Sequence, residues 1–264
     1  MCGTCGCDEA PTTGASDTVA VERDLLAKND GIAEDNRAWL ATRSVFAVNL
    51  MSAPGSGKTT LLETTVRELS RDVFVSAVEG DQAASLDADR LRAVGCRVVQ
   101  INTGSGCHLD ADMLARALRE LDPPRGSLVV VENVGNLVCP ALFDLGERRR
   151  VVLASTTEGE DKPLKYPHMF RAADLVVLTK ADLVPYLTFE VDHFTRHLRR
   201  VNPAAELIVT SSVSGEGLDQ WFSWLRSELG VSPVGPAESP EPTESAESAE
   251  SAEDTEAALP SVSS

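Results

Sequence analysis

The sequence predicts a doubly wound α/β fold, in which helices cover both faces of a mostly parallel sheet. Short runs of apolar residues recur along the chain, and helical patterns separate most of them. Within each run the apolar residues are largely continuous and do not alternate with polar ones. Continuous apolar runs are typical of strands buried on both faces, and alternation with helices favours parallel pairing. The expected strands cover residues 45–51, 73–78, 97–101, 128–132, 151–155, 175–179 and 207–210.

Helical spacing of apolar residues predicts the helices between these strands. They cover residues 59–69, 88–93, 110–121, 189–200 and 218–229. Residues 18–42 also carry apolar positions at rough helical spacing. An amphipathic helix is therefore expected before the first strand, with Gly31 as an interruption.

Both ends of the chain differ from the rest in composition. Residues 1–17 are small and polar apart from cysteines, which predicts a flexible arm. From Ser232 onward there are eight acidic residues and no lysine or arginine, in a Pro-, Ser- and Ala-rich context that buries too little apolar surface to fold. We expect one domain over residues 18–230, after the arm, and a disordered acidic tail over residues 231–264.

The composition excludes two classes of function. The formal net charge of the 264 residues is −17, whereas nucleic-acid binding needs a basic surface. No apolar run is long enough to cross a bilayer, and the first residues lack the features of a secretory signal. The sequence therefore favours a cytoplasmic protein with neither nucleic acid nor membrane as a partner.

A glycine-rich turn between an apolar strand and a helix predicts a P-loop. Such a turn points backbone N–H groups at phosphate oxygens, next to the positive end of a helix dipole. Lys58 is expected to reach the β- and γ-phosphates, and the Thr59 hydroxyl to ligate Mg²⁺. Serine stands at position 52, where the usual pattern opens with glycine. The expected phosphate-binding residues are Gly55, Ser56, Gly57, Lys58, Thr59 and Thr60.

The segment TKAD at residues 179–182 predicts guanine as the base. It is similar to the N/T-K-x-D element of GTPases, where the Asp accepts from guanine N1 and the exocyclic amine, and the Lys stem covers the ring. Adenine has no donors at those atoms and would leave the carboxylate of Asp182 unpaired beside Lys180. Ser211 resembles the loop that closes over the base, although an ordinary polar turn fits it equally well.

Acidic residues after two strands are the candidates for the Mg²⁺ shell and for positioning water. Asp81, in EGD, is the first choice, and Glu132, in ENVG, is the second because it resembles an ExxG element. Either could instead cap a helix. With Lys58 and Thr59 they form the candidate catalytic set. No glutamine or arginine finger is evident, so hydrolysis of GTP to GDP and phosphate is expected to be slow.

Three cysteines at the N-terminus predict a metal site in the arm. Cys2, Cys5 and Cys7 form C-x-x-C-G-C, which can wrap one ion with a backbone nitrogen as a further ligand. Thiolates with backbone nitrogen favour square-planar Ni²⁺, and tetrahedral Zn²⁺ is the alternative. A redox pair is disfavoured because the arm lacks a strand–helix context.

Cys107, His108 and Cys139 form a second set. They follow sheet strands, and a doubly wound fold brings such loops to the edge that holds the nucleotide. Two cysteines and a histidine suit Zn²⁺ or Ni²⁺. The other thiol, Cys96, is expected to be a buried structural cysteine, and a helical pair of histidines at 193 and 197 is expected on the surface.

Taken together and in order, these motifs resemble those of the hydrogenase nickel-incorporation GTPases, the HypB family. The similarity runs from about residue 18 to 229, together with the arm. It implies a P-loop GTPase of the SIMIBI class that forms a GTP-favoured homodimer. The segments are CGTCGC at 2–7, NLMSAPGSGKTTLLE at 49–63, VEGD at 78–81, GCHLD at 106–110, VENVGNLVCP at 131–140 and LTKADLV at 178–184.

The resemblance also implies the fate of the metal. The arm cysteines would form a high-affinity nickel site, and the second set a Ni²⁺ or Zn²⁺ site near the dimer interface. Nickel would pass to the large-subunit precursor of a [NiFe]-hydrogenase, with a HypA-type zinc protein as partner. Residues 8–44 contain no histidine, so bulk nickel storage is not expected.

Two other functions are open on the residues alone. One is a nickel or zinc buffer with a regulatory nucleotide site, which the intact Lys58, Thr59 and Asp182 disfavour. The other is an accessory GTPase for another nickel enzyme of the urease type, which the N-terminal cysteines disfavour.

Overall fold

All neighbouring strands of the sheet run parallel, as the apolar runs predicted. The computed structural model describes residues 13–81, 86–104 and 106–232, and within them the strand order is β3-β2-β4-β1-β5-β6-β7. Each expected strand is confirmed, with ends that move by at most three residues. The strands are β1 (Phe46–Ser52), β2 (Val75–Asp81), β3 (Arg97–Asn102), β4 (Leu128–Glu132), β5 (Arg149–Ser155), β6 (Leu175–Thr179) and β7 (Glu206–Val209).

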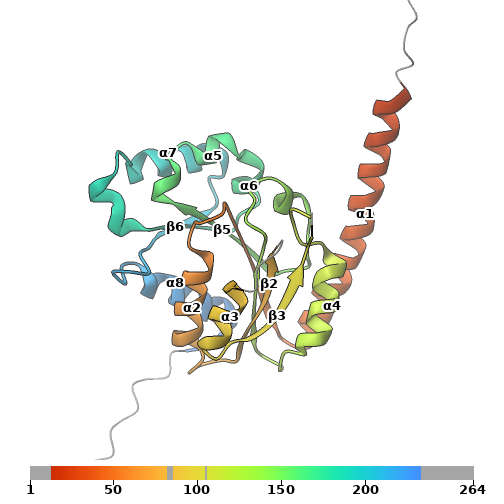
Figure 1. Ribbon diagram of the computed structural model, residues 1–264, viewed down its shortest axis with the longest axis horizontal. Coiled ribbons are helices and arrows are strands. Elements are labelled where there is room, and N and C mark those ends of the chain that lie inside the picture. Colours follow the sequence, from red (N-terminus) through yellow and green to blue (C-terminus); the bar gives the residue numbers. More distant parts are fainter. Residues whose placement is uncertain (1–12, 82–85, 105, 233–264) are drawn as a thin grey trace, which may run out of the picture. The chain divides into compact units, whose positions relative to one another are not determined.

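Helices cover both faces of this sheet (Figure 1). Alternate residues of the strands pack on α2 (Lys58–Leu69), α3 (Leu86–Ala93) and α8 (Leu218–Leu229) on one face. The other face is covered by α1 (Thr13–Thr42) and α4 (Ala111–Leu121) near β2 and β4, and by α6 (Pro167–Arg171) and α7 (Val191–Val201) near β5 and β6.

The short helix α5 (Lys162–Lys165) and α6 were not predicted from the sequence. They have four and five residues, so neither is long enough to show a helical period. The same holds for the 3₁₀ turns η1 (Cys139–Leu142), η2 (Thr156–Glu158) and η3 (Ala181–Tyr186). None of the helices in the described part of the chain is long and apolar enough to span a bilayer.

Helix α1 starts five residues earlier than predicted and continues through Gly31. It covers residues 13–17 of the expected arm, and the remaining residues of that arm, with residues 233–264 of the expected tail, lie outside the described ranges. Tertiary contacts hold the helix against the destabilising glycine. Asn29 Nδ2 donates to Asp144 O over 2.7 Å, and Asn36 Nδ2 donates to Ala111 O over 2.8 Å.

Candidate functional site

A cleft of about 500 Å³ lies at the carboxyl ends of β1, β2 and β4. The sheet order reverses around β1, and ligands of doubly wound folds bind at such a switch point. The cleft is lined by the turn after β1 with the start of α2, the end of β2, the end of β4 with the segment after it, and α3. Two further loops contribute one residue each, Cys107 and Lys180.

The turn after β1 depends on two glycines. Gly55 and Gly57 have φ angles of 73° and 96°, a left-handed region that favours residues without a Cβ. Gly57 is also the N-cap residue of α2 and offers no side-chain cap, so the first-turn N–H groups of the helix remain available to an anion. The turn and helix therefore have the local geometry of a phosphate site.

Ser52, which stands where glycine is usual, contacts the lysine of the motif. Its Oγ accepts a 2.8 Å hydrogen bond from Nζ of Lys58 and donates to Ala53 O over 2.7 Å. Both Ser52 and Lys58 are buried. Burial lowers the pKa of Lys58, while the charge of Glu132 opposes the shift. The serine therefore gives the buried ammonium group an acceptor at the base of the cleft.

Two glutamates face each other across adjacent strands beside Thr59. Glu79 of β2 and Glu132 of β4 are register partners, and both are buried. Oγ1 of Thr59 donates to Oε1 of Glu132 over 2.8 Å. Burial raises the pKa of Glu132, and burial with the charge of Glu132 raises the pKa of Glu79 to about 8.

These carboxylates fit a divalent cation. Oε2 of Glu79 and Oε2 of Glu132 are buried and have no hydrogen-bond partner among the described residues. Orphaned carboxylate oxygens next to a threonine hydroxyl form the oxygen-rich donor set that Mg²⁺ prefers. Asp81, the first choice from sequence, lines the same cleft, but Glu132 has the direct contact with Thr59.

Glu79 and Arg90 are among the cleft residues that the sequence did not single out. Glu79 was noted only as a neighbour of Asp81, although the dipeptide Val-Glu occurs near the carboxyl end of both strands, at residues 78–79 and 131–132, and could have signalled the pair. Arg90 of α3 lies at the rim, with Nη2 3.2 Å from Oγ1 of Thr60 and 2.9 Å from Oε2 of Glu63. Its position depends on how α3 packs on α2, which no motif encodes.

The TKAD segment joins the P-loop to the expected base site. Thr179 Oγ1 donates to Ser56 O over 2.6 Å, and Lys180, in the left-handed region at φ 61°, donates from Nζ to Gly55 O over 2.8 Å. Ser211 Oγ donates to Oδ1 of Asp182 over 2.5 Å. The structure therefore brings Asp182 and Ser211 together, as a base-binding role requires.

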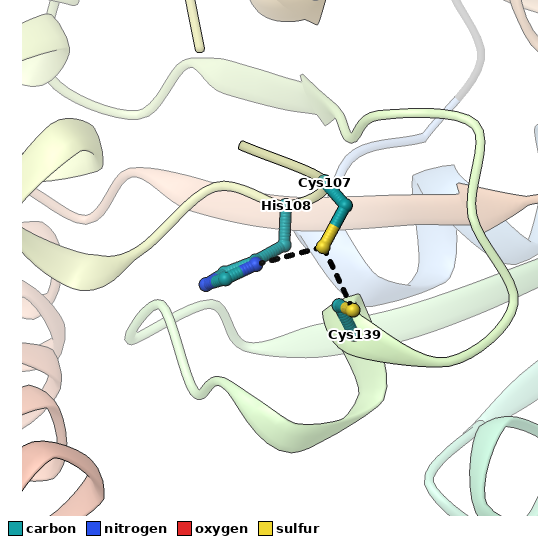
Figure 2. Close-up of side chains that lie close together, drawn as sticks. All are labelled: Cys107, His108 and Cys139. Carbon is teal, nitrogen blue, oxygen red and sulfur yellow. Dashed lines mark hydrogen bonds between the residues drawn. The ribbon is translucent and has the colours of Figure 1, made fainter. Parts of the chain in front are cut away.

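Cys107, His108 and Cys139 form one cluster (Figure 2). The sulfur atoms of the two cysteines are 2.8 Å apart, and Nδ1 of His108 is 3.7 Å from Sγ of Cys107. All three residues are half-buried, and their candidate ligand atoms lie within 4.8 Å of one another. The proximity predicted from the sheet is thus confirmed across 32 residues of sequence.

The chemistry of this cluster suits a borderline metal ion. Burial lowers the pKa of His108, which favours the neutral imidazole that coordinates metals, and the ring stacks on Phe143 at 3.9 Å. The hydrogen bond with Cys107 and burial raise the pKa of Cys139, so a metal would have to displace that proton. Two thiolates and an imidazole are ligands for Zn²⁺ or Ni²⁺.

Cys96, His193 and His197 contact groups away from this cluster. Cys96 is buried, and burial raises the pKa of its thiol to about 12. His193 Nδ1 lies 3.0 Å from Oε1 of Glu160, and His197 Nδ1 lies 2.9 Å from O of Glu160. In the described part of the chain, only the Cys107–His108–Cys139 cluster brings the ligand atoms of three Cys, His, Asp or Glu side chains within 4.8 Å of one another. Cys2, Cys5 and Cys7 lie outside it.

Comparisons with known proteins agree with this geometry. Residues 46–209 match a family model described as the CobW/HypB/UreG nucleotide-binding domain. The chain is 52% identical over 222 residues to hydrogenase maturation factor HypB of Azotobacter vinelandii, which covers 84% of this chain and 73% of the relative.

Two solved structures are also similar. HypB from Archaeoglobus fulgidus matches with a TM-score of 0.73 and 40% identity, over 77% of this chain and 100% of that one. HypB from Helicobacter pylori, solved in complex with nickel, matches with a TM-score of 0.72 and 37% identity, over 77% of this chain and 95% of that one.

The parallel sheet, the phosphate turn and the matching family model define a P-loop GTPase of the CobW/HypB/UreG class. Within that class, the identity to curated relatives is high over most of both chains. The chain belongs to the HypB family of hydrogenase maturation factors.

Proposed function

We propose that this protein is a GTP-hydrolysing nickel metallochaperone that delivers Ni²⁺ during maturation of a [NiFe]-hydrogenase. The observation that carries the proposal is the place of Cys107. It belongs to the metal cluster and also lines the cleft that holds Lys58 and Thr59. The nucleotide and the metal would therefore both lie against the loop of Cys107. A change from GTP to GDP can then alter the affinity of the cluster for the metal.

The proposed hydrolysis uses positioning and electrostatics. Phosphoryl transfer requires little covalent chemistry from the protein. Lys58 would bind the β- and γ-phosphates, while Thr59, Glu132 and Asp81 would hold Mg²⁺, which neutralises phosphate charge when bound.

Guanine selectivity is assigned to Asp182. The carboxylate would accept from guanine N1 and the exocyclic amine, and its Oδ1 already accepts a hydrogen bond from Ser211. That bond fixes the carboxylate before the base binds, which lowers the ordering cost of recognition. Lys180, held by Gly55 O, would place its stem along the ring.

The proposal also assigns the two metal sites and the proteins that receive the nickel. The Cys107–His108–Cys139 cluster would bind Ni²⁺ as cargo or Zn²⁺, and Cys2, Cys5 and Cys7 would form a separate nickel site. We infer a GTP-favoured homodimer in the cytoplasm that works with a HypA-type zinc protein and the large-subunit precursor of the hydrogenase. The nickel in the Helicobacter pylori relative supports a nickel role.

The test measures nickel affinity of the purified full chain with GDP and with a non-hydrolysable GTP analogue, and GTP hydrolysis with Lys58→Ala as the inactive control. We expect nickel affinity to differ between the two nucleotides, and turnover to vanish in the variant. Cells lacking the protein should regain hydrogenase activity when it is supplied. Equal nickel affinities with both nucleotides, or no GTP hydrolysis, would instead indicate a metal buffer.

A further inference from the structure

We propose that Asn133 is the positioning residue that couples the nucleotide cleft to the metal cluster. Its Oδ1 accepts hydrogen bonds from two backbone N–H groups in two loops: Leu109 at 3.2 Å and Val134 at 2.9 Å. The first loop carries Cys107 and His108, and the second leads to Cys139. One oxygen atom therefore ties together the two segments that supply the metal ligands.

The other contacts of Asn133 anchor it to β1. Its Nδ2 donates to Oδ1 of Asn49 over 3.3 Å, and its backbone N donates to Leu50 O over 3.0 Å. Asn49 in turn donates from Nδ2 to Oε1 of Glu147 over 3.2 Å. Asn133, Asn49 and Glu147 are all buried, so rotation of the Asn133 side chain would leave polar groups without partners.

The segment after Asn133 lies directly against the P-loop. A Cβ on Gly135 would lie 3.1 Å from Cα of Pro54, which is closer than most side chains tolerate. Residues 133–136 line the nucleotide cleft together with that turn. A change at the γ-phosphate position that moves Gly135 must therefore move Val134, whose N–H is held by Asn133.

The loop on the metal side is equally constrained. Leu109 is buried and follows His108 directly. A Cβ on Gly80 would lie 2.8 Å from Cγ of Leu109, so this side chain is packed on the end of β2. Leu109 is thus fixed to the sheet, and Oδ1 of Asn133 is the link between this fixed loop and the segment that can move.

The consequence is a defined regulation of the cluster, which rests on the proposed function. When Oδ1 of Asn133 accepts from the N–H groups of both Leu109 and Val134, the distance between the loops of Cys107 and Cys139 is fixed. Displacement of Val134 breaks one bond and releases Cys139 relative to Cys107. Nucleotide state then changes metal affinity, and the metal changes nucleotide affinity by the same factor.

The test uses the full-length chain with Cys2→Ser, Cys5→Ser and Cys7→Ser, so that nickel binding reports on the cluster. Nickel dissociation constants are measured with GDP and with a non-hydrolysable GTP analogue. We expect their ratio in this background to be at least about fivefold. In Asn133→Ala the ratio should fall below about twofold, although nickel and GDP still bind.

Two further variants make the result decisive. Asn133→Asp keeps the acceptor oxygen and loses the Nδ2 donor, and it should keep the ratio of the two nickel dissociation constants. If the role of Asn133 were merely structural, loss of that donor would lower the ratio as much as Asn133→Ala does. Asn102→Ala is the matched control, because Oδ1 of Asn102 accepts a 2.8 Å hydrogen bond from Gly104 N within its own loop. It should leave the ratio unchanged.

The outcomes separate this inference from the proposed function. Equal nickel dissociation constants with GDP and with the GTP analogue in the chain that still has Asn133 would contradict both the proposed nucleotide-dependent chaperone and the coupling. A ratio that persists in Asn133→Ala would overturn only the role of Asn133. If Asn133→Ala does not fold, as judged by circular dichroism, Asn133→Asp decides, and loss of the ratio in that variant with intact GDP affinity would overturn the inference.

Discussion

The hydroxyl of Thr59 donates a 2.8 Å hydrogen bond to Oε1 of Glu132, joining the first turn of α2 to the end of β4. The second oxygen of Glu132 is buried without a partner among the described residues. A buried carboxylate with one oxygen unpaired is destabilised unless a cation or proton compensates it. The pair therefore connects the phosphate turn to the proposed Mg²⁺ site.

Glu132→Gln should separate charge from shape at this position. The amide keeps the size of the side chain and an acceptor for Thr59, but it removes the negative charge. We expect GTP hydrolysis to fall about 100-fold, with GDP affinity in the absence of Mg²⁺ changed by less than about threefold. Phosphate release at saturating GTP measures the effect. Glu68→Gln, at the far end of α2, is the control, and equal turnover in both variants would contradict the role of Glu132.

The sequence predicted the elements whose signal is local. The strands were found because their apolar runs are continuous, and the cluster of Cys107 and Cys139 because parallel strands end at one edge of the sheet. Glu79 was passed over because its partner, Glu132, lies on a strand that is adjacent only in the folded sheet. Helix α1 passes through Gly31 because Asn29 and Asn36 contact distant backbone groups, which no local pattern contains.

Asp182→Asn should change the base that the protein prefers. The amide offers a donor where guanine presents the donors of N1 and its exocyclic amine, so GTP affinity should fall by at least about 100-fold. Xanthine carries a carbonyl oxygen in place of that amine and should bind the variant better than guanine does. Competition between GTP and XTP for a fluorescent nucleotide measures the change. Unaltered preference for GTP would argue against the assignment.

Ser211→Ala tests the partner of that carboxylate. The substitution removes the 2.5 Å hydrogen bond to Asp182 and leaves the recognising group in place. We expect a loss in GTP affinity of about tenfold, the size of one hydrogen bond to a charged group. The same competition assay applies. An effect as large as that of Asp182→Asn would mean that Ser211 itself carries the specificity.

Cys107→Ser and Cys139→Ser should abolish tight binding at the cluster. Serine does not supply a thiolate, and loss of a direct ligand should lower Zn²⁺ affinity by at least about 100-fold in a chain without the arm cysteines. Titration against a chromophoric chelator measures the affinity. Cys96→Ala removes a thiol that is buried away from the cluster and is the matched control. If it weakens binding as much, the loss in the other variants reflects a general disturbance of the fold.

Glu79 should make the stability of the metal-free protein depend on pH. Its pKa rises from the ordinary 4.5 to about 8 on folding, because the side chain is buried beside Glu132. Between these two values the folded protein holds a proton that the unfolded chain has released. The free energy of unfolding therefore decreases as pH rises through this window.

Glu79→Gln removes this contribution, so the variant should gain stability over the wild type as pH increases. The difference in the free energy of unfolding should be small at pH 5 and on the order of 1–3 kcal/mol at pH 8, which is several degrees in Tm. Thermal melts in chelator at pH 5, 6.5 and 8 measure it, with Glu120→Gln on the exposed side of α4 as the control. Added Mg²⁺ and GDP should reduce the advantage of Glu79→Gln at pH 8, because a bound cation compensates the ionised carboxylate. An advantage that is constant across the pH range would show that Glu79 does not exchange a proton on folding.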